Sequence, residues 1–245
     1  MEIITSVSNK KIKDIKKLKQ KKYRDKEEKF IVEGWHLIES ALENKVVEII
    51  ITTDINYKNI DVEVLYVKEN VMKSISTLQN SSSFLAVCKQ LKKDIDLSSD
   101  LVILDNIQDP GNLGTILRNS LAFAYKNIIL SNDSVDIYNP KTIQASQGAI
   151  FSINYKYVDL SKQLLILKKE GYLLIGTALK NSMPLNKDVI IRDKKAFVFG
   201  NEGQGIREDL LDVMDYCYQI EIENIDSLNV SSATAIIFYQ FNTKN

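Results

Sequence analysis

Three short polar stretches hold the residues of this chain that are best suited to chemistry. They are residues 105–114 (Asp-Asn-Ile-Gln-Asp-Pro-Gly-Asn-Leu-Gly), 200–205 (Gly-Asn-Glu-Gly-Gln-Gly) and 227–231 (Ser-Leu-Asn-Val-Ser), and each comes after a run that is predicted to be a β-strand. The glycines of 200–205 leave backbone N–H and C=O groups open to a planar ligand or a phosphate. Because parallel α/β sheets bind ligands beyond the carboxyl ends of their strands, the three stretches together predict one site.

Each side chain in these stretches also has a purely structural interpretation. Ser227 and Asn229 can cap the helix predicted over 233–241 by accepting from its free N–H groups. Glu202 either caps the next helix or contacts a ligand. Arg118 falls about one and a half turns after Asn112 on the helix predicted over 115–124, so it either reaches back to the loop or forms a surface salt bridge.

The glycine spacing argues against the common nucleotide sites. No G-x-G-x-x-G fingerprint follows a predicted strand, and no G-x-x-x-x-G-K-[ST] loop is present. A nucleotide-dependent enzyme of ordinary doubly wound topology, such as a dehydrogenase, is therefore disfavoured. Tight binding of NAD would be the observation that supports this alternative.

The elements that position these stretches alternate between strand and helix from Leu101 onward. This pattern predicts an α/β fold with a mostly parallel sheet and helices on both faces. The expected strands are 101–104, 128–130, 151–158, 173–176, 196–199 and 218–222, and the helices between them lie near 115–124, 141–148, 163–169 and 207–213.

The first part of the chain forms a second, smaller α/β unit in this interpretation. A helix is expected over 10–28, with strands at 30–32, 46–51, 62–67 and 84–88 and further helices near 37–42 and 71–78. Residues 92–100 are polar and without a clear period, which is typical of a linker. The predicted domains are therefore 1–95 and 96–245.

The composition is that of a globular, cytoplasmic protein. Its 245 residues are 44% hydrophobic, which is ample for a core, and no apolar run approaches the ~18 residues of a membrane span. The N-terminal residues contain no apolar segment of a secretory signal. Cys88 and Cys217 lack metal-ligand spacing and are expected to be reduced, and with no Cys/His cluster we expect no metal.

Charge is unevenly distributed along the chain. Residues 1–29 contain eleven Lys/Arg and five Asp/Glu, a net charge of +6, whereas the remainder carries −6 and the whole chain is neutral. Such asymmetry indicates either a basic arm that meets nucleic-acid phosphates or a solvated helix face. If the affinity for RNA did not depend on salt concentration, the basic arm would be excluded as a phosphate-binding segment, since phosphate contacts release counterions.

Two residues at the start of the helix near 37–42 have unusual side chains. His36 is the only histidine, and we expect it to be a partly exposed residue rather than a catalytic one. Trp35 has the surface to stack on a base, but an aromatic beside Leu37 and Ile38 is more often part of a core.

Taken together, the three stretches resemble the motifs of the SpoU/TrmH family of RNA ribose 2′-O-methyltransferases, within the SPOUT class. The matches are residues 112–118 (Asn-Leu-Gly-Thr-Ile-Leu-Arg), 197–206 (Phe-Val-Phe-Gly-Asn-Glu-Gly-Gln-Gly-Ile) and 227–233 (Ser-Leu-Asn-Val-Ser-Ser-Ala). Residues 140–151 are similar to the family's intermotif helix. The resemblance implies a C-terminal trefoil knot and an N-terminal substrate-binding domain of the ribosomal L30e type.

The resemblance also implies a cofactor, a substrate and roles for residues. The cofactor would be S-adenosylmethionine, held by backbone groups at Gly200, Ile220 and Leu228. Arg118 would be the catalytic arginine, and the residues that organise the site would be Asn112, Glu202, Ser227 and Asn229. The family is dimeric and acts on structured RNA, and relatives with this type of N-terminal domain favour rRNA over tRNA.

One segment departs from the family pattern. Before the Ser-Leu-Asn core the family usually has Ile-Pro-hydrophobic-x-Gly, whereas residues 220–226 are Ile-Glu-Ile-Glu-Asn-Ile-Asp, with neither Pro nor Gly. This raises an alternative, an RNA-binding or ribosome-assembly protein that keeps the fold but has a degenerate cofactor loop. Titration with S-adenosylmethionine distinguishes the two functions.

Overall fold

The structure, a computed structural model, describes residues 2–91, 93–178, 182–185, 194–225 and 227–242. The chain divides into two compact units, Met1–Leu91 with Asp136–Phe151, and Lys92–Val135 with Ser152–Asn245. We expected a division after residue 95. By packing, it falls after Leu91, and residues 136–151, which we expected in the larger domain, pack with the first unit.

The first unit is built on a five-stranded mixed sheet in the order β1-β4-β3-β5-β2. β3 pairs in parallel with β4 and antiparallel with β5, and β5 pairs antiparallel with β2. The strands are β1 (Ile3–Ile4), β2 (Lys29–Glu33), β3 (Val47–Thr52), β4 (Glu63–Val67) and β5 (Phe84–Lys89). The two-residue edge strand β1 was not predicted, because two residues carry no alternation pattern.

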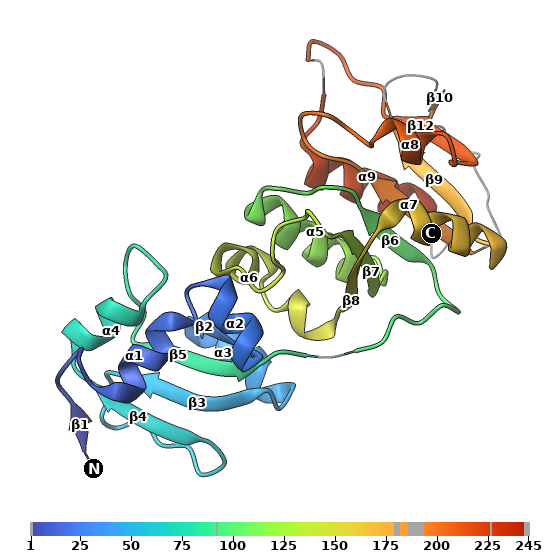
Figure 1. Cartoon of the computed structure of the whole chain (residues 1–245). Coiled ribbons are helices and arrows are strands. Elements are labelled where there is room, and N and C mark those ends of the chain that lie inside the picture. The colour runs from blue at the N-terminus through green and yellow to red at the C-terminus, as the bar shows by residue number, and fades with distance from the viewer. Residues whose placement is uncertain (1, 92, 179–181, 186–193, 226, 243–245) are drawn as a thin grey trace. The chain divides into compact units, whose positions relative to one another are not determined.

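Helices cover this sheet on both faces. One face presents Ile31, Ile51 and Leu85 to α1 (Lys10–Lys17) and α4 (Glu69–Ile75), which lie side by side in Figure 1. The alternate side chains point to the other face, where Phe30 meets Tyr138 with ring centroids 4.5 Å apart. The remaining helices are α2 (Lys21–Glu27), α3 (Trp35–Glu43) and α6 (Pro140–Ser146).

The single helix expected over 10–28 is wrong, because the structure has two helices there. α1 ends at Lys17, and the N–H groups of Leu18, Lys19 and Gln20 each bond to the carbonyl three residues back. The guanidinium of Arg24 donates to the carbonyls of Leu18 (3.0 Å) and Lys19 (2.8 Å). These carbonyls are thereby occupied and the helix stops, which a periodicity of apolar residues does not reveal.

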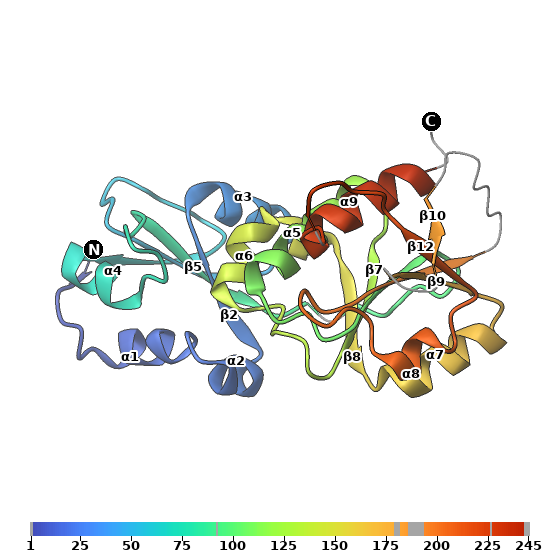
Figure 2. The ribbon, with the colours of Figure 1, turned by 90° about the horizontal axis from the view of Figure 1, so that it is seen from above.

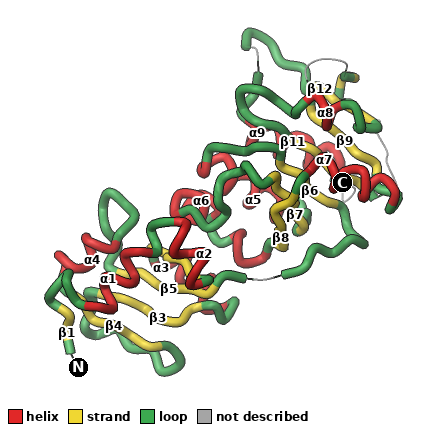
Figure 3. Tube along the Cα trace, in the orientation of Figure 1, coloured by secondary structure: helices red, strands yellow, loops and turns green. Residues whose placement is uncertain are grey.

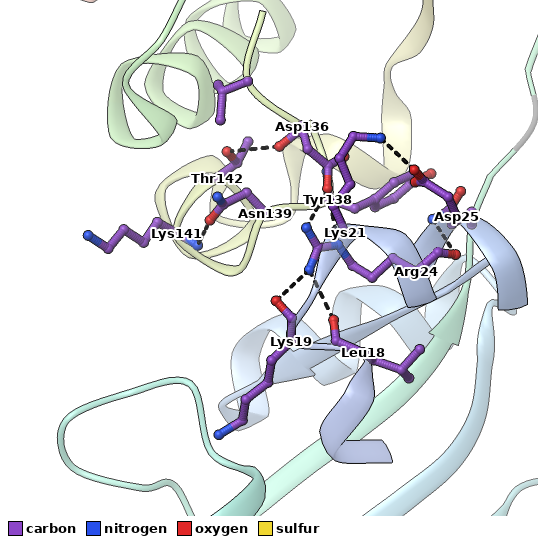
Figure 4. A network of polar contacts seen from close by, with 12 residues as sticks. Leu18, Lys19, Lys21, Arg24, Asp25, Asp136, Tyr138, Asn139, Lys141 and Thr142 are labelled. Atoms are coloured by element: carbon purple, nitrogen blue, oxygen red, sulfur yellow. Dashed lines mark hydrogen bonds and ion pairs between the residues drawn. The ribbon is translucent and has the colours of Figure 1, made fainter. Parts of the chain in front are cut away.

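Arg24 also ties α2 to the distant segment 136–151. It is only 3% exposed and donates to Asp136 Oδ2 from Nε (3.0 Å) and Nη2 (2.6 Å). The other oxygen of Asp136 accepts from the backbone N–H of Tyr138. Figure 4 shows Arg24 at the centre of this network, with Asp136 on one side and the two carbonyls on the other.

The second unit is built on a seven-stranded sheet in the order β10-β12-β9-β11-β6-β7-β8, and every described pairing in it is parallel. This confirms the predicted sheet, whose alternation of strand and helix can be followed in Figure 3. The strands are β6 (Leu101–Leu104), β7 (Asn127–Ser131), β8 (Asn154–Val158), β9 (Leu173–Thr177), β10 (Met183–Pro184), β11 (Lys195–Phe199) and β12 (Tyr216–Gln219). Two expected strands are shorter, because residues 149–152 form a 3₁₀ turn before β8 and β12 ends at Gln219.

Helices lie on both faces of this sheet, as predicted. Ile103 and Val198 pack with α7 (Leu160–Lys169) and α8 (Glu208–Leu211) on one face. Phe197 and Phe199 contact Phe238 of α9 (Val230–Phe241) on the opposite face, where α9 packs on α5 (Pro110–Ala122). Figure 2 shows α5 and α9 on one side of the strands and α7 and α8 on the other.

Both cysteines are free thiols. Cys88 is buried and Cys217 is half-buried, and burial raises the pKa of each thiol. Among the described residues, no helix is long and apolar enough to cross a membrane.

The Arg24 network makes a prediction about the stability of the first unit. Arg24→Ala leaves the buried Asp136 carboxylate without its partner and should lower the free energy of unfolding by about 3–5 kcal/mol. Lys21→Ala on the same helix removes only an exposed pair with Asp25 and should cost about 0–1 kcal/mol. Urea unfolding followed by the fluorescence of Trp35, the only tryptophan, measures both. Similar losses for the two variants would contradict this account.

Candidate active site

The site is placed by two neighbouring parallel strands. β6 and β11 pair in register from Leu101 with Ala196 to Leu104 with Phe199, so the loops that follow them leave the sheet side by side. From β6 the sheet continues outward to β7 and β8, and from β11 to β9 and β12. Such a switch point between two halves of a parallel sheet is where α/β proteins bind ligands.

A cleft of about 560 Å³ lies at the carboxyl ends of β11, β9 and β12, and the loop that follows β6 is not among its described lining residues. Five of the predicted site residues line it, namely Gly200, Glu202, Ile220, Ser227 and Leu228. The wall is completed by residues that follow β9, by the rest of the 200–206 loop, by Tyr218 and by residues at the start of α9. Burial raises the pKa of the Tyr218 phenol above its usual range.

A chain of amide hydrogen bonds joins the three polar stretches. Asn229 Nδ2 donates to Asn112 Oδ1 (2.8 Å), and Asn112 Nδ2 donates to Glu202 Oε1 (2.9 Å). Each amide therefore uses a donor toward the next stretch, and the Glu202 carboxylate accepts at the end. The prediction that the three stretches form one site is supported by this direct contact.

Asn229 is at the same time the cap of α9. Its Oδ1 accepts from the backbone N–H of Ser231 (2.8 Å) and from the Ser231 hydroxyl (2.6 Å). The structural and the functional interpretations of this residue therefore both hold, because the amide oxygen caps the helix while the amide nitrogen reaches Asn112.

The glycine loop is organised by Asn201, which the sequence analysis did not single out. Its backbone pairs with Gly205 in both directions, and its Oδ1 accepts from the N–H groups of Gly203 and Gln204. Its Nδ2 donates to the carbonyl of Asn106 (2.9 Å). The loop thereby returns on itself, and a Cβ added at Gly200 would lie only 2.1 Å from the carbonyl carbon of Gly205.

Asp105 and Arg207, which the sequence analysis also missed, anchor the far end of this loop. Asp105 is fully buried and accepts from the Arg207 backbone N–H (3.0 Å) and from its Nε (2.9 Å). A signal was available, because a carboxylate directly after four buried apolar residues needs a partner. Its partner could not be identified, since it lies about one hundred residues away in the sequence.

Arg118 is the predicted residue that the structure does not bring to the others. It lies exposed on α5, and its side chain has no hydrogen bond or ion pair among the described residues. α5 already contains Asn112, and the six steps from Asn112 to Arg118 turn the arginine about 120° away around the helix. The neighbouring Asn119 instead ties α5 to α9, by donating to the Ser231 carbonyl (2.7 Å) and the Thr234 hydroxyl (3.2 Å).

The described part of the chain contains no group of three or more His, Cys, Asp or Glu side chains placed to hold a metal ion. His36 is exposed at the start of α3 in the first unit, as expected. Trp35, at 41% exposure, packs edge-on against Tyr57 and Phe84.

The tight turn at Gly200 makes a second prediction. Gly200→Ala forces the 200–206 loop apart and should destabilise the second unit by about 2 kcal/mol or more. Gly203→Ala, where the added Cβ would meet only Asn201 Oδ1 at 3.6 Å, should stay within about 0.5 kcal/mol of the wild type. Calorimetric unfolding of both variants tests this, and equal effects would mean that the loop is free to relax.

Comparisons with known proteins place this fold and site in a family. Residues 100–239 match the SpoU rRNA methylase family, and residues 9–86 match the MRM3-like substrate-binding domain. The 23S rRNA (guanosine(2553)-2′-O)-methyltransferase RlmP of Bacillus subtilis is 32% identical over 245 residues, covering 98% of each chain. The 23S rRNA (guanosine-2′-O-)-methyltransferase RlmB of Coxiella burnetii is 32% identical over 142 residues, covering 57% of this chain and 56% of the relative.

Solved structures agree with the sequence comparison. An rRNA methyltransferase from Sinorhizobium meliloti superposes with a TM-score of 0.86 at 27% identity, covering 98% of this chain and 96% of the other. A second structure from that organism, described as AdoMet-bound, gives a TM-score of 0.86 at 26% identity, with the same coverage. The chain therefore belongs to the SpoU rRNA methylase family.

Proposed function

We propose that this protein transfers a methyl group from S-adenosylmethionine to a ribose 2′-hydroxyl of 23S rRNA. The observation that carries the proposal is the cleft at the carboxyl ends of β11, β9 and β12, where the lining residue Glu202 is joined by hydrogen bonds to Asn112 and through it to Asn229. The RNA is chosen because RlmP, similar over 98% of both chains, is named for methylating guanosine 2553 of 23S rRNA. A guanosine of 23S rRNA is accordingly the substrate that we propose.

The residues of the cleft fit S-adenosylmethionine. A volume of about 560 Å³ is in the usual range for small-molecule sites. Gly200 has no room for a side chain, and its backbone can approach a flat ligand closely, while Ile220 and Leu228 offer apolar surface. These are the three positions proposed to hold the adenosine end. A related structure is described as bound to this cofactor.

The cofactor supplies a sulfonium-bound methyl group that is already an activated electrophile. The protein must then hold the ribose 2′-oxygen in line and help it to lose its proton. Alignment alone can be worth on the order of 7–11 kcal/mol in the best cases. Glu202 and Ser227, which line the cleft, would provide this alignment, with Asn112 and Asn229 holding Glu202 through their chain of hydrogen bonds.

Arg118 is the proposed catalytic arginine. A guanidinium has an unperturbed pKa above ~12 and is a poor base, so its role would be to stabilise negative charge as it develops on the 2′-oxygen. The guanidinium would bridge that oxygen and an RNA phosphate through the N–H donors of its planar, forked end. Since the Asn112 amide bonds to Glu202 and Asn229, we assign Asn112 to positioning these two side chains rather than to orienting Arg118.

A homodimer could give Arg118 a partner that it does not have among the described residues of one chain. The outer side of α9 exposes Ile236 (39%) and Tyr239 (62%), and Tyr239 stands edge-on to Phe123, directly after α5, with ring centroids 6.4 Å apart. Such an apolar face is suited to pair with a second copy, and the family resemblance implies a dimer with residues of both subunits at each site. Sedimentation at micromolar concentration should show the dimer mass. The trefoil knot and the cytoplasmic location belong to the same proposal.

The experiment that tests the function is a map of 2′-O-methyl groups in total RNA from cells with and without the gene. One 23S rRNA guanosine should lose its methyl group in the deletion strain and regain it on complementation. Isothermal titration should show S-adenosylmethionine binding. An unchanged map, with no cofactor binding at millimolar concentration, would favour the RNA-binding or assembly alternative that the altered loop at 220–225 raises.

The arginine role makes a separate prediction. Arg118→Lys keeps the positive charge but loses the planar fork, and turnover should fall by about 10²–10³-fold. Affinity for S-adenosylmethionine should be unchanged, because Arg118 does not line the cleft. Methyl transfer from radiolabelled cofactor to 23S rRNA measures turnover. A lysine variant with near-normal turnover would contradict the role.

A further inference from the structure

The structure divides the eleven cationic side chains of residues 1–29 into two groups. Seven are engaged by other groups of the first unit. Arg24 bonds to Asp136, and Lys19 donates to the carbonyls of Ser74 (3.1 Å) and Ser76 (2.5 Å) at the end of α4. Ion pairs to Glu63, Asp14, Asp25, Glu27 and Glu48 hold Lys11, Lys17, Lys21, Lys26 and Lys29, respectively.

The other four lysines are Lys10, Lys13, Lys16 and Lys22. All are exposed, and their side chains make no hydrogen bond or ion pair with any residue that the structure describes. Lys16 lies in the last turn of α1, where a positive charge is favoured by the helix dipole. Lys16 therefore has a structural explanation, whereas Lys10, Lys13 and Lys22 do not have this one.

Helix energetics disfavour two of these three lysines. Lys10 is the first residue of α1 and Lys22 the second of α2, and neither first turn contains an acidic residue. The amino end of a helix carries partial positive charge, so a lysine there opposes folding. Neither lysine supports its helix, and neither forms a hydrogen bond or an ion pair with a described residue, so both ammonium groups are open to an external anion.

Two of these three lysines lie in one row on α1 together with Lys17, whose ammonium is paired with Asp14. Lys10, Lys13 and Lys17 follow one another at i, i+3 and i+7 on the side of α1 opposite the buried Ile12 and Ile15. They span about 10 Å along the helix. The ring of Tyr23 continues this line into α2, because the Nζ atoms of Lys17 and Lys22 each lie 5.9 Å from its centroid.

We propose that Lys10 and Lys13 of α1 and Lys22 of α2, with Lys17 and Tyr23 between them, form a basic surface that binds phosphates of the RNA substrate. The proposal rests on the proposed function and adds where the first unit meets RNA. Residues 30–245 carry a net charge of −6, so the attraction is local to this surface. The outer side of α1 carries Asp14 and lysines without an exposed apolar side chain, which suits a phosphate backbone better than a lipid layer.

Lysines that contact phosphates add affinity without reading sequence. The basic surface should therefore lower KM for RNA and leave turnover at saturating RNA unchanged. It should also make binding depend on salt, with a slope of about 0.7–0.9 in log K against log[salt] for each phosphate contact.

The test compares two triple variants with equal change in charge. Lys10→Gln/Lys13→Gln/Lys22→Gln removes three lysines of the basic surface, whereas Lys11→Gln/Lys21→Gln/Lys26→Gln removes three ion-paired lysines from the same two helices. Binding of fluorescently labelled 23S rRNA transcript is titrated from 50 to 300 mM KCl. The first variant should lose about two units of salt slope, and the second should stay within about half a unit of the wild type.

Stability provides an independent readout. Because Lys10 and Lys22 oppose their helix dipoles, the first variant should melt no lower than the wild type while binding RNA more weakly. Equal losses of slope in the two variants would show a general charge effect and overturn the proposal. The proposal would also be overturned if the first variant bound anionic phospholipid vesicles more weakly than the wild type but bound RNA equally well.

These outcomes separate the basic surface from the proposed reaction. Weaker RNA binding by the first variant, in a protein that transfers no methyl group, would retain the surface and reject the function. Normal methyl transfer, with both variants binding like the wild type, would retain the function and reject the surface. A wild type that binds no RNA at any salt concentration would reject the surface outright.

Discussion

The parallel pairing of β6 with β11 is the contact on which the site depends. It sets Leu104 level with Phe199, so that Asp105 and Gly200 leave the sheet at the same height. From there the Asp105–Arg207 ion pair and the Asn201–Asn106 hydrogen bond join the two loops. A slip of one residue would turn Phe197 and Phe199 away from α9, so the same register determines both the core and the site.

The hydrogen-bonded chain that ends at Glu202 is built from amides rather than from charged groups alone. An asparagine can accept on one side and donate on the other, and Asn112 does both, between Asn229 and Glu202. An aspartate at this position could not donate, and its charge would repel the Glu202 carboxylate. The choice of asparagine is therefore explained by the direction of the hydrogen bonds.

Much of the fold could be predicted from the sequence, because apolar runs and short polar caps are local signals. The parallel sheet, its helices on both faces, the cap at Asn229 and the grouping of the three polar stretches all follow from such patterns. The break at 18–20 did not, since it depends on the Arg24 guanidinium and on an aspartate 112 positions away. Asn201, Asp105 and the outward position of Arg118 were missed for the same reason, because side-chain partners distant in sequence leave no periodic trace.

The segment Asp136–Phe151 packs with the first unit although the second unit precedes and follows it in the chain. The backbone therefore passes between the units three times, near residues 91, 135 and 151. A recombination event with one crossover could exchange a domain carried on a single linker. In this protein, a single crossover would separate Arg24 from Asp136 and leave a buried charge without its partner. An exchange of the first 91 residues alone would therefore preserve this contact only if the incoming sequence also supplied a partner for Asp136.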